Sequence, residues 1–366
     1  MNYKDIKNIQ TAQELGEKIA LKSDEIKEIE SLIKLFPMSI PDYYISLIDE
    51  PYRKDPIAKM CIPSSDEKII SGSFDTSGEY ENTIMPGLQH KYSMTALILS
   101  TNKCAMYCRH CFRKRMVGIE KMEEDINIEQ VINYIKTHDE INNVLISGGD
   151  AFLLGPNILN KYLEELSKIE HLDFIRVGTR IPVVCPQLLD SNSPIIETLR
   201  KFTKRKRIYV ITQFNHPKEI TNASMRAIKK LQKSDIVVKN QTVLLSGIND
   251  NALIIANLMR QLVAIGVVPY YIFQCRPVRG VENQFQVPLI QGYEIVEEAK
   301  KNLSGLAKSF RYCMSHPTGK IEIMGKSLNP EGKVEMFFKY HEAKKEEDNG
   351  RIFSRYVTEK EKWLML

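Results

Sequence analysis

The stretch "ALILSTNKCAMYCRHCFRKRMVG" (residues 96–118) joins a short apolar run to three closely spaced cysteines, Cys104, Cys108 and Cys111. Its opening residues are mostly apolar and predict a buried strand. The cysteines follow where that strand would end, and a basic run (113–115) comes directly after them. Three thiols gathered at the end of a strand indicate a bound group, so the next question is which fold presents them.

Similar short runs recur five more times, separated by segments with the periodicity of amphipathic helices. They occupy residues 143–147, 173–179, 207–214, 235–245 and 268–275. Six strand–helix repeats predict a parallel sheet with right-handed connections. The predicted fold class is therefore α/β, with a partial (β/α)6 barrel of the TIM-barrel type.

Polar and glycine-containing segments stand at the carboxyl ends of these runs. They include "SGGD" (147–150), "GTR" (178–180), "QFNH" (213–216) and "QCRPVRG" (274–280). In barrels of this kind the chemistry lies at the carboxyl ends of the strands. We therefore expect these segments and the cysteines to surround one site.

The barrel pattern occupies only part of the chain. Residues 1–90 are charge-rich and helical in pattern, for example over 11–36, and they end in an arm rich in proline and glycine. We predict a helical N-terminal region with its arm over 1–90, the barrel over 91–300 and a short C-terminal extension over 301–366.

Composition sets the broad class of protein. The chain is 43% hydrophobic and 27% charged, as in ordinary globular proteins, and its net charge of +5 suggests no polyanion partner. We expect the basic run "KFTKRKR" (201–207) to lie on a solvated helix end and the loop before a strand, so no nucleic-acid partner is expected. The N-terminus lacks the apolar core of a secretion signal, and the most apolar window (252–273) is interrupted by polar residues, so no membrane span is expected. Seven cysteines, an odd number, favour a reducing cytoplasm.

Several kinds of site use clustered cysteines. A tetrahedral zinc site usually takes two close pairs, and this chain has no second close pair. A disulfide would leave one thiol over, and a redox dithiol needs only Cys108 and Cys111. An iron–sulfur cluster with three cysteine ligands fits best, because it leaves one iron open to an outside ligand.

The CxxxCxxC spacing of Cys104, Cys108 and Cys111, after the first strand of a parallel barrel, resembles the radical S-adenosylmethionine (radical SAM) superfamily. The resemblance implies a [4Fe–4S] cluster whose open iron binds SAM. It also implies that an electron from the cluster cleaves SAM to a 5′-deoxyadenosyl radical.

The segment "SGGD" supports the same resemblance. Gly148, Gly149 and Asp150 match the superfamily motif for the SAM amino group, and His110 stands where an aromatic usually lies near the adenine. The alternative for this segment is a plain turn in which Asp150 caps the next helix.

Six blocks in order resemble the lysine 2,3-aminomutase family of this superfamily, over about residues 85–330. They are "CAMYCRHCFRKRMVG", "ISGGDAFLL", "RVGTRIPVVCPQLL", "TQFNHPKEIT", "NQTVLLSGIND" and "VPYYIFQC". The resemblance implies an isomerase that uses SAM and pyridoxal 5′-phosphate (PLP) and moves an amino group from C2 to C3 of an amino acid. In such enzymes the cofactors do the chemistry, while the protein orients them and excludes water.

Two further residues match the family. Lys320 follows Pro317 and Gly319, as the family's PLP lysine follows a Pro/Gly-rich turn, although the turn is shorter here. The alternative for Lys320 is an ordinary turn lysine entering a strand. Arg113 matches the arginine that binds the substrate α-carboxylate, a task suited to a bidentate guanidinium. The two cations after Arg113 could be solvated or could hold backbone carbonyls.

Three positions depart from the lysine enzyme. Arg276 and Ser315 stand where that enzyme has two carboxylates for the distal ammonium of its substrate, and a cation there disfavours lysine. Arg276 and Arg279 would suit a distal carboxylate, unless Arg276 pairs with an acid such as Glu282. Thr95 stands where relatives carry an arginine that helps to hold the PLP phosphate. Another cation therefore compensates, or PLP is held differently or lost.

The sequence thus predicts a radical SAM, PLP-dependent 2,3-aminomutase that prefers an acidic or neutral amino acid to lysine. The alternative is a radical SAM enzyme of the same fold that abstracts hydrogen without PLP or acts on a protein-borne residue. We expect a cellular reductant such as flavodoxin or ferredoxin to supply electrons, and the resemblance favours a homo-oligomer.

Overall fold

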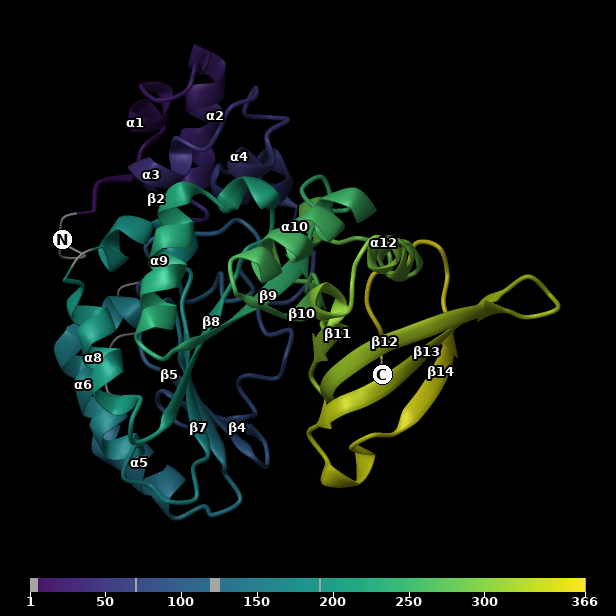
Figure 1. Ribbon diagram of the computed structural model, residues 1–366. Coiled ribbons are helices and arrows are strands. Elements are labelled where there is room, and N and C mark those ends of the chain that lie inside the picture. The colour runs from purple at the N-terminus through teal and green to yellow at the C-terminus, as the bar shows by residue number, and fades with distance from the viewer. Residues whose placement is uncertain (1–5, 70, 119–125, 191, 366) are drawn as a thin grey trace.

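The computed structural model describes residues 6–69, 71–118, 126–190 and 192–365. Within these ranges twelve strands form one sheet in the linear order β14-β13-β12-β11-β10-β9-β8-β7-β6-β5-β4-β3 (Figure 1). Because the order is linear, the parallel strands form an open, partial barrel. This is the α/β fold class that the sequence predicts.

The predicted strands are all present and form the parallel part of the sheet. They are β5 (Thr95–Leu99), β6 (Asn143–Ser147), β7 (Phe174–Gly178), β8 (Arg207–Thr212), β9 (Val237–Leu244) and β10 (Val268–Gln274). A further strand, β11 (Arg311–His316), also pairs parallel with β10 and was not predicted. Its sequence "RYCMSH" mixes polar and apolar residues, so it lacks the apolar run that marks the other six.

The helices between these strands include four segments with clear helical periodicity in the sequence. Those four are α5 (Ile128–Lys136), α6 (Gly155–Leu166), α8 (Pro194–Phe202) and α10 (Ala252–Ala264), and the structure adds α9 (Asn222–Lys233) and α12 (Leu289–Lys301). In α8 the buried residues Ile196, Leu199 and Phe202 recur every three positions, and Arg200 and Lys201 lie in its last turn. An apolar stripe of this kind packs a helix against a sheet while its polar face meets water.

Shorter helical segments complete the barrel. They are α7 (Ile181–Val184), α11 (Glu282–Phe285) and the 3-10 turns η2 (Ser65–Lys68), η4 (Ala151–Leu154), η5 (Pro186–Leu189), η6 (Pro217–Glu219), η7 (Leu306–Lys308) and η8 (Glu346–Asp348).

Antiparallel strands extend the sheet at both edges. At one edge stand β4 (Leu88–Tyr92) and β3 (Thr83–Met85), and at the other stand β12 (Gly319–Leu328), β13 (Val334–Ala343) and β14 (Ile352–Tyr356). Figure 1 shows the last three as the yellow part of the chain. The C-terminal extension therefore continues the barrel sheet, while the domain boundaries at residues 90 and 300 stay predictions.

The N-terminal region lies beside α9 and α10 in Figure 1 and is mainly helical. It contains α1 (Ala12–Gly16), α2 (Ser23–Ile33), α3 (Asp42–Ile45), α4 (Pro56–Cys61) and a small ladder of β1 (Asn8–Ile9) with β2 (Ile40–Pro41). The helical pattern over 11–36 is thus two helices. The first begins at Thr11, whose side chain accepts a hydrogen bond from the Glu14 N–H in a capping box.

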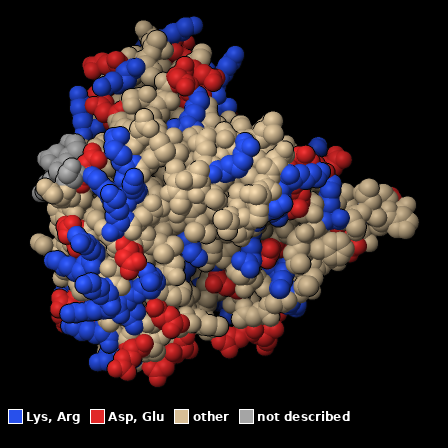
Figure 2. Space-filling view, viewed as in Figure 1, with Lys and Arg blue, Asp and Glu red and all other residues tan. Residues whose placement is uncertain are grey.

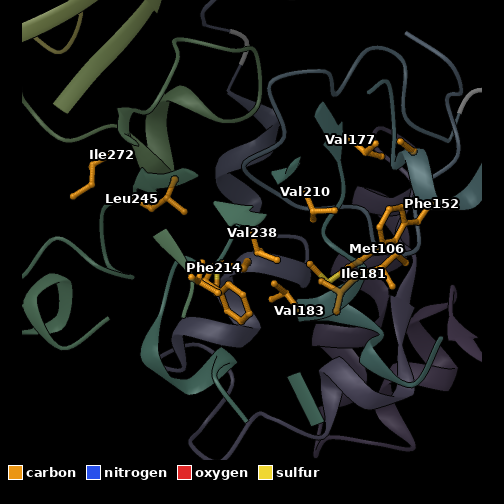
Figure 3. Close-up of a cluster of buried hydrophobic side chains, with 14 of the residues drawn as sticks. Met106, Phe152, Val177, Ile181, Val183, Val210, Phe214, Val238, Leu245 and Ile272 are labelled. Carbon is orange, nitrogen blue, oxygen red and sulfur yellow. The ribbon is translucent and has the colours of Figure 1, made fainter. Parts of the chain in front are cut away.

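The core joins the strands to the cysteine-bearing loop. Val177, Val210 and Val238 come from three neighbouring strands and are at most 1% exposed. Figure 3 shows Met106, from the loop between Cys104 and Cys108, beside Ile181 among these buried side chains. A side chain buried at this depth anchors the loop to the barrel.

The surface carries mixed charge. Figure 2 shows Lys and Arg side chains gathered at the lower left, over α6 and α8, with acidic groups among them. The basic run 201–207 spans the end of α8 and the start of β8, as predicted, and Arg207 pairs with Asp235 at 3.1 Å. Of the helices that the structure describes, none has the length and apolar character needed to cross a membrane.

Candidate active site

A cavity of about 360 Å³ lies inside the partial barrel and extends to the carboxyl ends of its strands. Apart from Arg279, the site residues predicted from the sequence line this cavity, although they are spread over more than 200 positions. They are Thr95, Cys104, Cys108, His110, Cys111, Arg113, Gly148, Gly149, Asp150, Arg276, Ser315 and Lys320. What each residue binds stays a prediction.

The cysteine loop (104–111) is held in place by the N-terminal region. The Tyr107 N–H donates to the Ser39 carbonyl at 2.9 Å, and the Arg109 N–H donates to the Met60 carbonyl at 2.9 Å. These backbone bonds fix the loop at points between the cysteines. The N-terminal region therefore positions the cysteines, a role that its helical pattern alone does not reveal.

A buried charge cluster strengthens this attachment. Glu67 accepts hydrogen bonds from Arg109 Nε at 2.8 Å and from Lys114 Nζ at 2.6 Å, and all three side chains are at most 6% exposed. Burial acts to raise the pKa of Glu67, but the two cations outweigh burial and hold that pKa below its usual value. Lys114 also donates to the Gly280 carbonyl at 3.1 Å, so of the two alternatives it holds backbone carbonyls.

Gly148 and Gly149, which directly follow β6, allow the backbone to pass close to the segment just before the cysteine loop. A Cβ atom on Gly148 would lie 2.3 Å from the Thr101 carbonyl oxygen, and one on Gly149 would lie 2.2 Å from that of Lys103. Gly148 also has a φ of +125°, which side chains rarely adopt. The close approach in the structure is to the protein's own backbone, and the role of these glycines toward SAM stays a prediction.

Asp150 makes the contacts expected of a capping residue. Its carboxylate accepts hydrogen bonds from the Phe152 N–H at 3.0 Å and the Arg180 N–H at 2.7 Å. Burial raises the pKa of Asp150. The turn-capping alternative is therefore present, and a role toward the SAM amino group would be added to it.

His110 is held between two side-chain amides. Its Nε2 lies 3.1 Å from Gln213 Nε2 and 3.2 Å from Asn215 Nδ2, an arrangement that favours the tautomer with the proton on Nδ1. Burial lowers the pKa of His110 well below its usual value. The Nδ1 atom is buried and has no partner, which leaves a donor for a ligand in the cavity.

The three thiols of the loop suit a cluster that supplies positive charge. Burial raises the pKa of Cys104 well above its usual value and that of Cys111 to about 11, so a cationic group is needed to keep them as thiolates. Arg180, from the "GTR" segment, donates to Cys108 Sγ and pairs with Glu219 at 2.6 Å. Among the described residues, no group of three or more His, Cys, Asp or Glu side chains is placed to hold a single metal ion.

Arg113 is oriented by an acid that sequence reasoning missed. Its Nε donates to Glu79 at 2.9 Å, its Nη1 donates to the Gly148 carbonyl at 3.3 Å, and it stacks on Phe112. Arg115 pairs with the same Glu79 carboxylate. Glu79 lies in the Gly-rich arm, and no pattern there distinguishes it from neighbouring acids.

Arg276 and Ser315, the two departures from the lysine enzyme, contact each other. Arg276 Nη2 donates to Ser315 Oγ at 2.8 Å, and the guanidinium carbon lies 4.1 Å from the centroid of the Phe112 ring. Its Nη1 is buried and has no hydrogen-bond partner, and burial lowers the pKa of Arg276 to about 10. Within the described chain no ion pair joins Arg276 to Glu282, and Arg279 does not line the cavity.

Lys320 is the second residue of β12, just after a two-residue hairpin loop of Pro317 and Thr318. Its side chain is 12% exposed, lines the cavity and pairs with Glu342 of β13. Burial acts to raise the pKa of Glu342, but Lys320 and Arg176 outweigh it and keep that pKa low. Sequence reasoning missed Glu342, although the alternating run 334–343 predicts a strand that would carry it.

The chain is similar to known proteins over most of its length. Residues 98–258 match the family model of the radical SAM superfamily. A putative L-lysine 2,3-aminomutase of Aquifex aeolicus (strain VF5) is 37% identical over 339 residues, which cover 92% of this chain and 89% of the relative.

Two further relatives are also 2,3-aminomutases. The L-lysine 2,3-aminomutase of Methanococcus maripaludis is 39% identical over 87% of this chain and 73% of its own length. A glutamate 2,3-aminomutase of Clostridioides difficile (strain 630) is 36% identical over 83% of this chain and 71% of its own length.

Proposed function

The chain belongs to the lysine 2,3-aminomutase family of radical SAM enzymes, and from this premise we propose that it moves the amino group of an acidic amino acid from C2 to C3. Enzymes of this family are isomerases that use a [4Fe–4S] cluster, SAM and PLP. When bound, the cluster and SAM supply a hydrogen-abstracting 5′-deoxyadenosyl radical, and PLP holds the amino group and delocalises the unpaired electron.

At one end of the cavity the residues suit the cluster and SAM. Cys104, Cys108 and Cys111 would hold three irons of the cluster, which leaves the fourth for SAM. The unpartnered Nδ1–H of His110 would donate to SAM, and Asp150 would accept from its amino group.

At the other end Lys320 would anchor PLP. A lysine must lose a proton before it can react with a carbonyl. The Glu342 carboxylate pairs with the Lys320 ammonium and would hold this side chain in the cavity until PLP binds. Arg113, oriented by Glu79, would bind the substrate α-carboxylate.

The observation that carries the substrate assignment is the contact between Arg276 and Ser315. This contact holds the Arg276 guanidinium in the lining of the cavity, at the position where the lysine enzyme has acids. Its Nη1 is buried and has no hydrogen-bond partner. A distal ammonium there would face a cation, and the acid that interacts with this cation, Glu79, already pairs with Arg113 and Arg115. A distal carboxylate would instead form charge-assisted hydrogen bonds.

The overall charge of the cavity favours the same class of substrate. More basic than acidic residues line it: Lys91, Arg113, Arg176, Arg180, Arg276 and Lys320 against Glu79, Asp150 and Glu342. An acidic amino acid brings two carboxylates and PLP brings a phosphate, so these ligands offset the excess of cations. The similarity to a glutamate 2,3-aminomutase supports an acidic substrate.

We propose that the enzyme works in the cytoplasm as a homo-oligomer and takes its electrons from a flavodoxin or ferredoxin. Enzymes of this superfamily act on small molecules and need such a reductant.

The direct test is product analysis. Reconstituted, reduced enzyme with SAM and PLP is incubated with each of glutamate, aspartate, alanine and lysine, and β-amino acid products are detected by mass spectrometry. A β-amino acid from glutamate or aspartate is expected. A product from lysine alone would contradict the proposed preference, and no product from any amino acid would favour hydrogen abstraction on another substrate.

Two sets of variants separate the roles. Borohydride should fix PLP to the wild type at Lys320, and Lys320→Gln should lose this label. Arg276→Asp should weaken turnover of the acidic substrate about 10- to 100-fold and improve lysine. Arg279→Asp makes the same charge reversal outside the cavity and should leave the preference unchanged. Equal effects of the two reversals would remove Arg276 from the substrate site.

A further inference from the structure

Three polar side chains are linked across neighbouring parallel strands at the Thr95 side of the cavity. Asn143 Nδ2 donates to Thr95 Oγ1 at 3.1 Å, and Asn143 Oδ1 accepts a hydrogen bond from Arg176 Nη2. Thr95 and Asn143 are register partners on β5 and β6, and Arg176 lies on β7. Thr95 and Arg176 both line the cavity.

Arg176 has hydrogen-bonding capacity that the protein leaves unused. Its Nε is buried and has no partner, and no acid lies within ion-pair distance of it among the described residues. A partly buried guanidinium that no acid pairs with directly is destabilised, because charge is removed from water without full compensation. In accord with this, burial lowers the pKa of Arg176. The geometry therefore favours an anionic ligand in the cavity, which would pair with the Arg176 guanidinium.

We propose that Arg176 binds the phosphate of PLP in this chain and supplies the charge that Thr95, in place of the family's arginine, does not. The Asn143 side chain accepts a hydrogen bond from the guanidinium and donates one to the Thr95 hydroxyl, so it orients both groups. A guanidinium suits a phosphate, because its N–H groups match the oxygens bidentately and it stays charged. This inference rests on the proposed function, since it assumes that PLP is the cofactor.

The other cations of the cavity have their own partners. Lys320 pairs with Glu342, and Arg113 pairs with Glu79. Lys91 Nζ donates to the carbonyls of Ser77 at 3.1 Å and His316 at 2.5 Å. Arg180 pairs with Glu219 beside the cysteine loop.

Arg276 also has a free donor, but it contacts Phe112 and Ser315 and not the group around Thr95. Arg176 is therefore the cation that combines an unused donor with a link to Thr95 through Asn143. Glu342 is close enough to act on the pKa of Arg176, which it raises. The Glu342 carboxylate, however, accepts its hydrogen bond from Lys320, so the Arg176 Nε remains available.

The test compares PLP with pyridoxal, which lacks only the phosphate. Reconstituted wild type and Arg176→Gln are titrated with each compound, and imine formation at Lys320 is followed by absorbance. We expect Arg176→Gln to bind PLP about 10- to 100-fold more weakly and to bind pyridoxal as the wild type does. Adding Thr95→Arg to Arg176→Gln should restore PLP binding, because it returns a cation to the family's position.

Two further variants serve as controls for the effect of Arg176→Gln. Lys239→Gln removes a cation on β9 that stacks on Tyr209 and Tyr270 outside the cavity, and it should bind both compounds normally. Arg176→Lys keeps the charge without the fork and should lie between the wild type and Arg176→Gln. Unchanged PLP binding by Arg176→Gln would overturn this inference alone, and so would equal weakening of PLP and pyridoxal. A wild type that takes up no PLP would instead overturn the proposed function.

Discussion

The two ends of the cavity are built differently. The cysteine end, which comprises Cys104, Cys108, Cys111 and the adjoining Gly148 and Gly149, is held by backbone hydrogen bonds and buried contacts to the N-terminal region. The lysine end, which comprises Lys320, Glu342, Thr95 and Arg176, is formed by side chains from separate strands. The first follows the superfamily pattern closely, whereas the second carries replacements. A rigid backbone frame constrains the residues it holds, whereas individual side chains can change and shift specificity.

The largest effect should come from removing a thiol at the cysteine end. Cys108→Ala is expected to abolish release of 5′-deoxyadenosine from SAM, because the cluster loses one of three ligands. PLP should still be fixed by borohydride, because the lysine end is untouched. Cys185→Ala, a buried cysteine outside the cavity lining, is the control and should keep SAM cleavage. Cleavage by Cys108→Ala would contradict the cluster assignment, and loss of PLP as well would show that the two ends are coupled.

An intermediate effect should follow from breaking the buried charge cluster under the cysteine loop. Glu67→Gln leaves Arg109 and Lys114 buried without an acid and is expected to cost about 3–5 kcal/mol of unfolding free energy. The measurements are denaturant unfolding and the iron content after reconstitution, which should both fall. Glu165→Gln breaks the exposed pair with Lys168 and should change stability by less than about 1 kcal/mol. Similar costs for the two variants would mean that Glu67 does not hold the loop.

The smallest effect concerns pH and the surplus of cations near Lys320. Burial, followed by repulsion from Arg276, Lys344 and Lys320, lowers the pKa of Lys91 to about 7. In the unfolded chain that pKa is about 10.4, so between these pH values the unfolded chain binds more protons than the folded one. Stability should therefore rise with pH across this window, by up to about 1.4 kcal/mol per pH unit from Lys91.

The measurement is urea unfolding at pH 7, 8 and 9. The rise attributable to Lys91 should be missing in Lys91→Met and present in Lys239→Met, the matched lysine outside the cavity. Parallel pH dependences for the wild type and Lys91→Met would show that Lys91 keeps its proton between pH 7 and 9. Burial and the neighbouring cations would then not lower its pKa.

Much of this architecture could be predicted from the sequence. The six apolar runs became β5 to β10, because a buried parallel strand needs a continuous apolar segment, which is visible without the fold. β11 was missed because half of its residues are polar. The cysteines, Gly148, Gly149 and Lys320 could be singled out because they match motifs of the family, and the structure brings them into one cavity.

The partners of these residues could not be predicted in the same way. Glu79, Glu342 and Arg176 are ordinary charged residues in sequence, and only the fold brings them into the cavity. Arg176 had a weak signal, since a cation at the centre of the buried strand "FIRVG" needs an explanation. Glu67 had none, because nothing in the arm distinguishes it from the neighbouring acids.

The hairpin of β11 and β12 has a consequence for how this enzyme can change. Ser315 and Lys320 are cross-strand partners across a two-residue loop, so both side chains project from the same face of the sheet. A slip of β12 by a single residue would turn Lys320 to the opposite face while Ser315 stayed. An insertion that caused such a slip would therefore move Lys320, the proposed PLP anchor, away from the face that carries Ser315. Because the turn is shorter here than in the family, its two-residue length fixes Ser315 and Lys320 on the same face of the sheet.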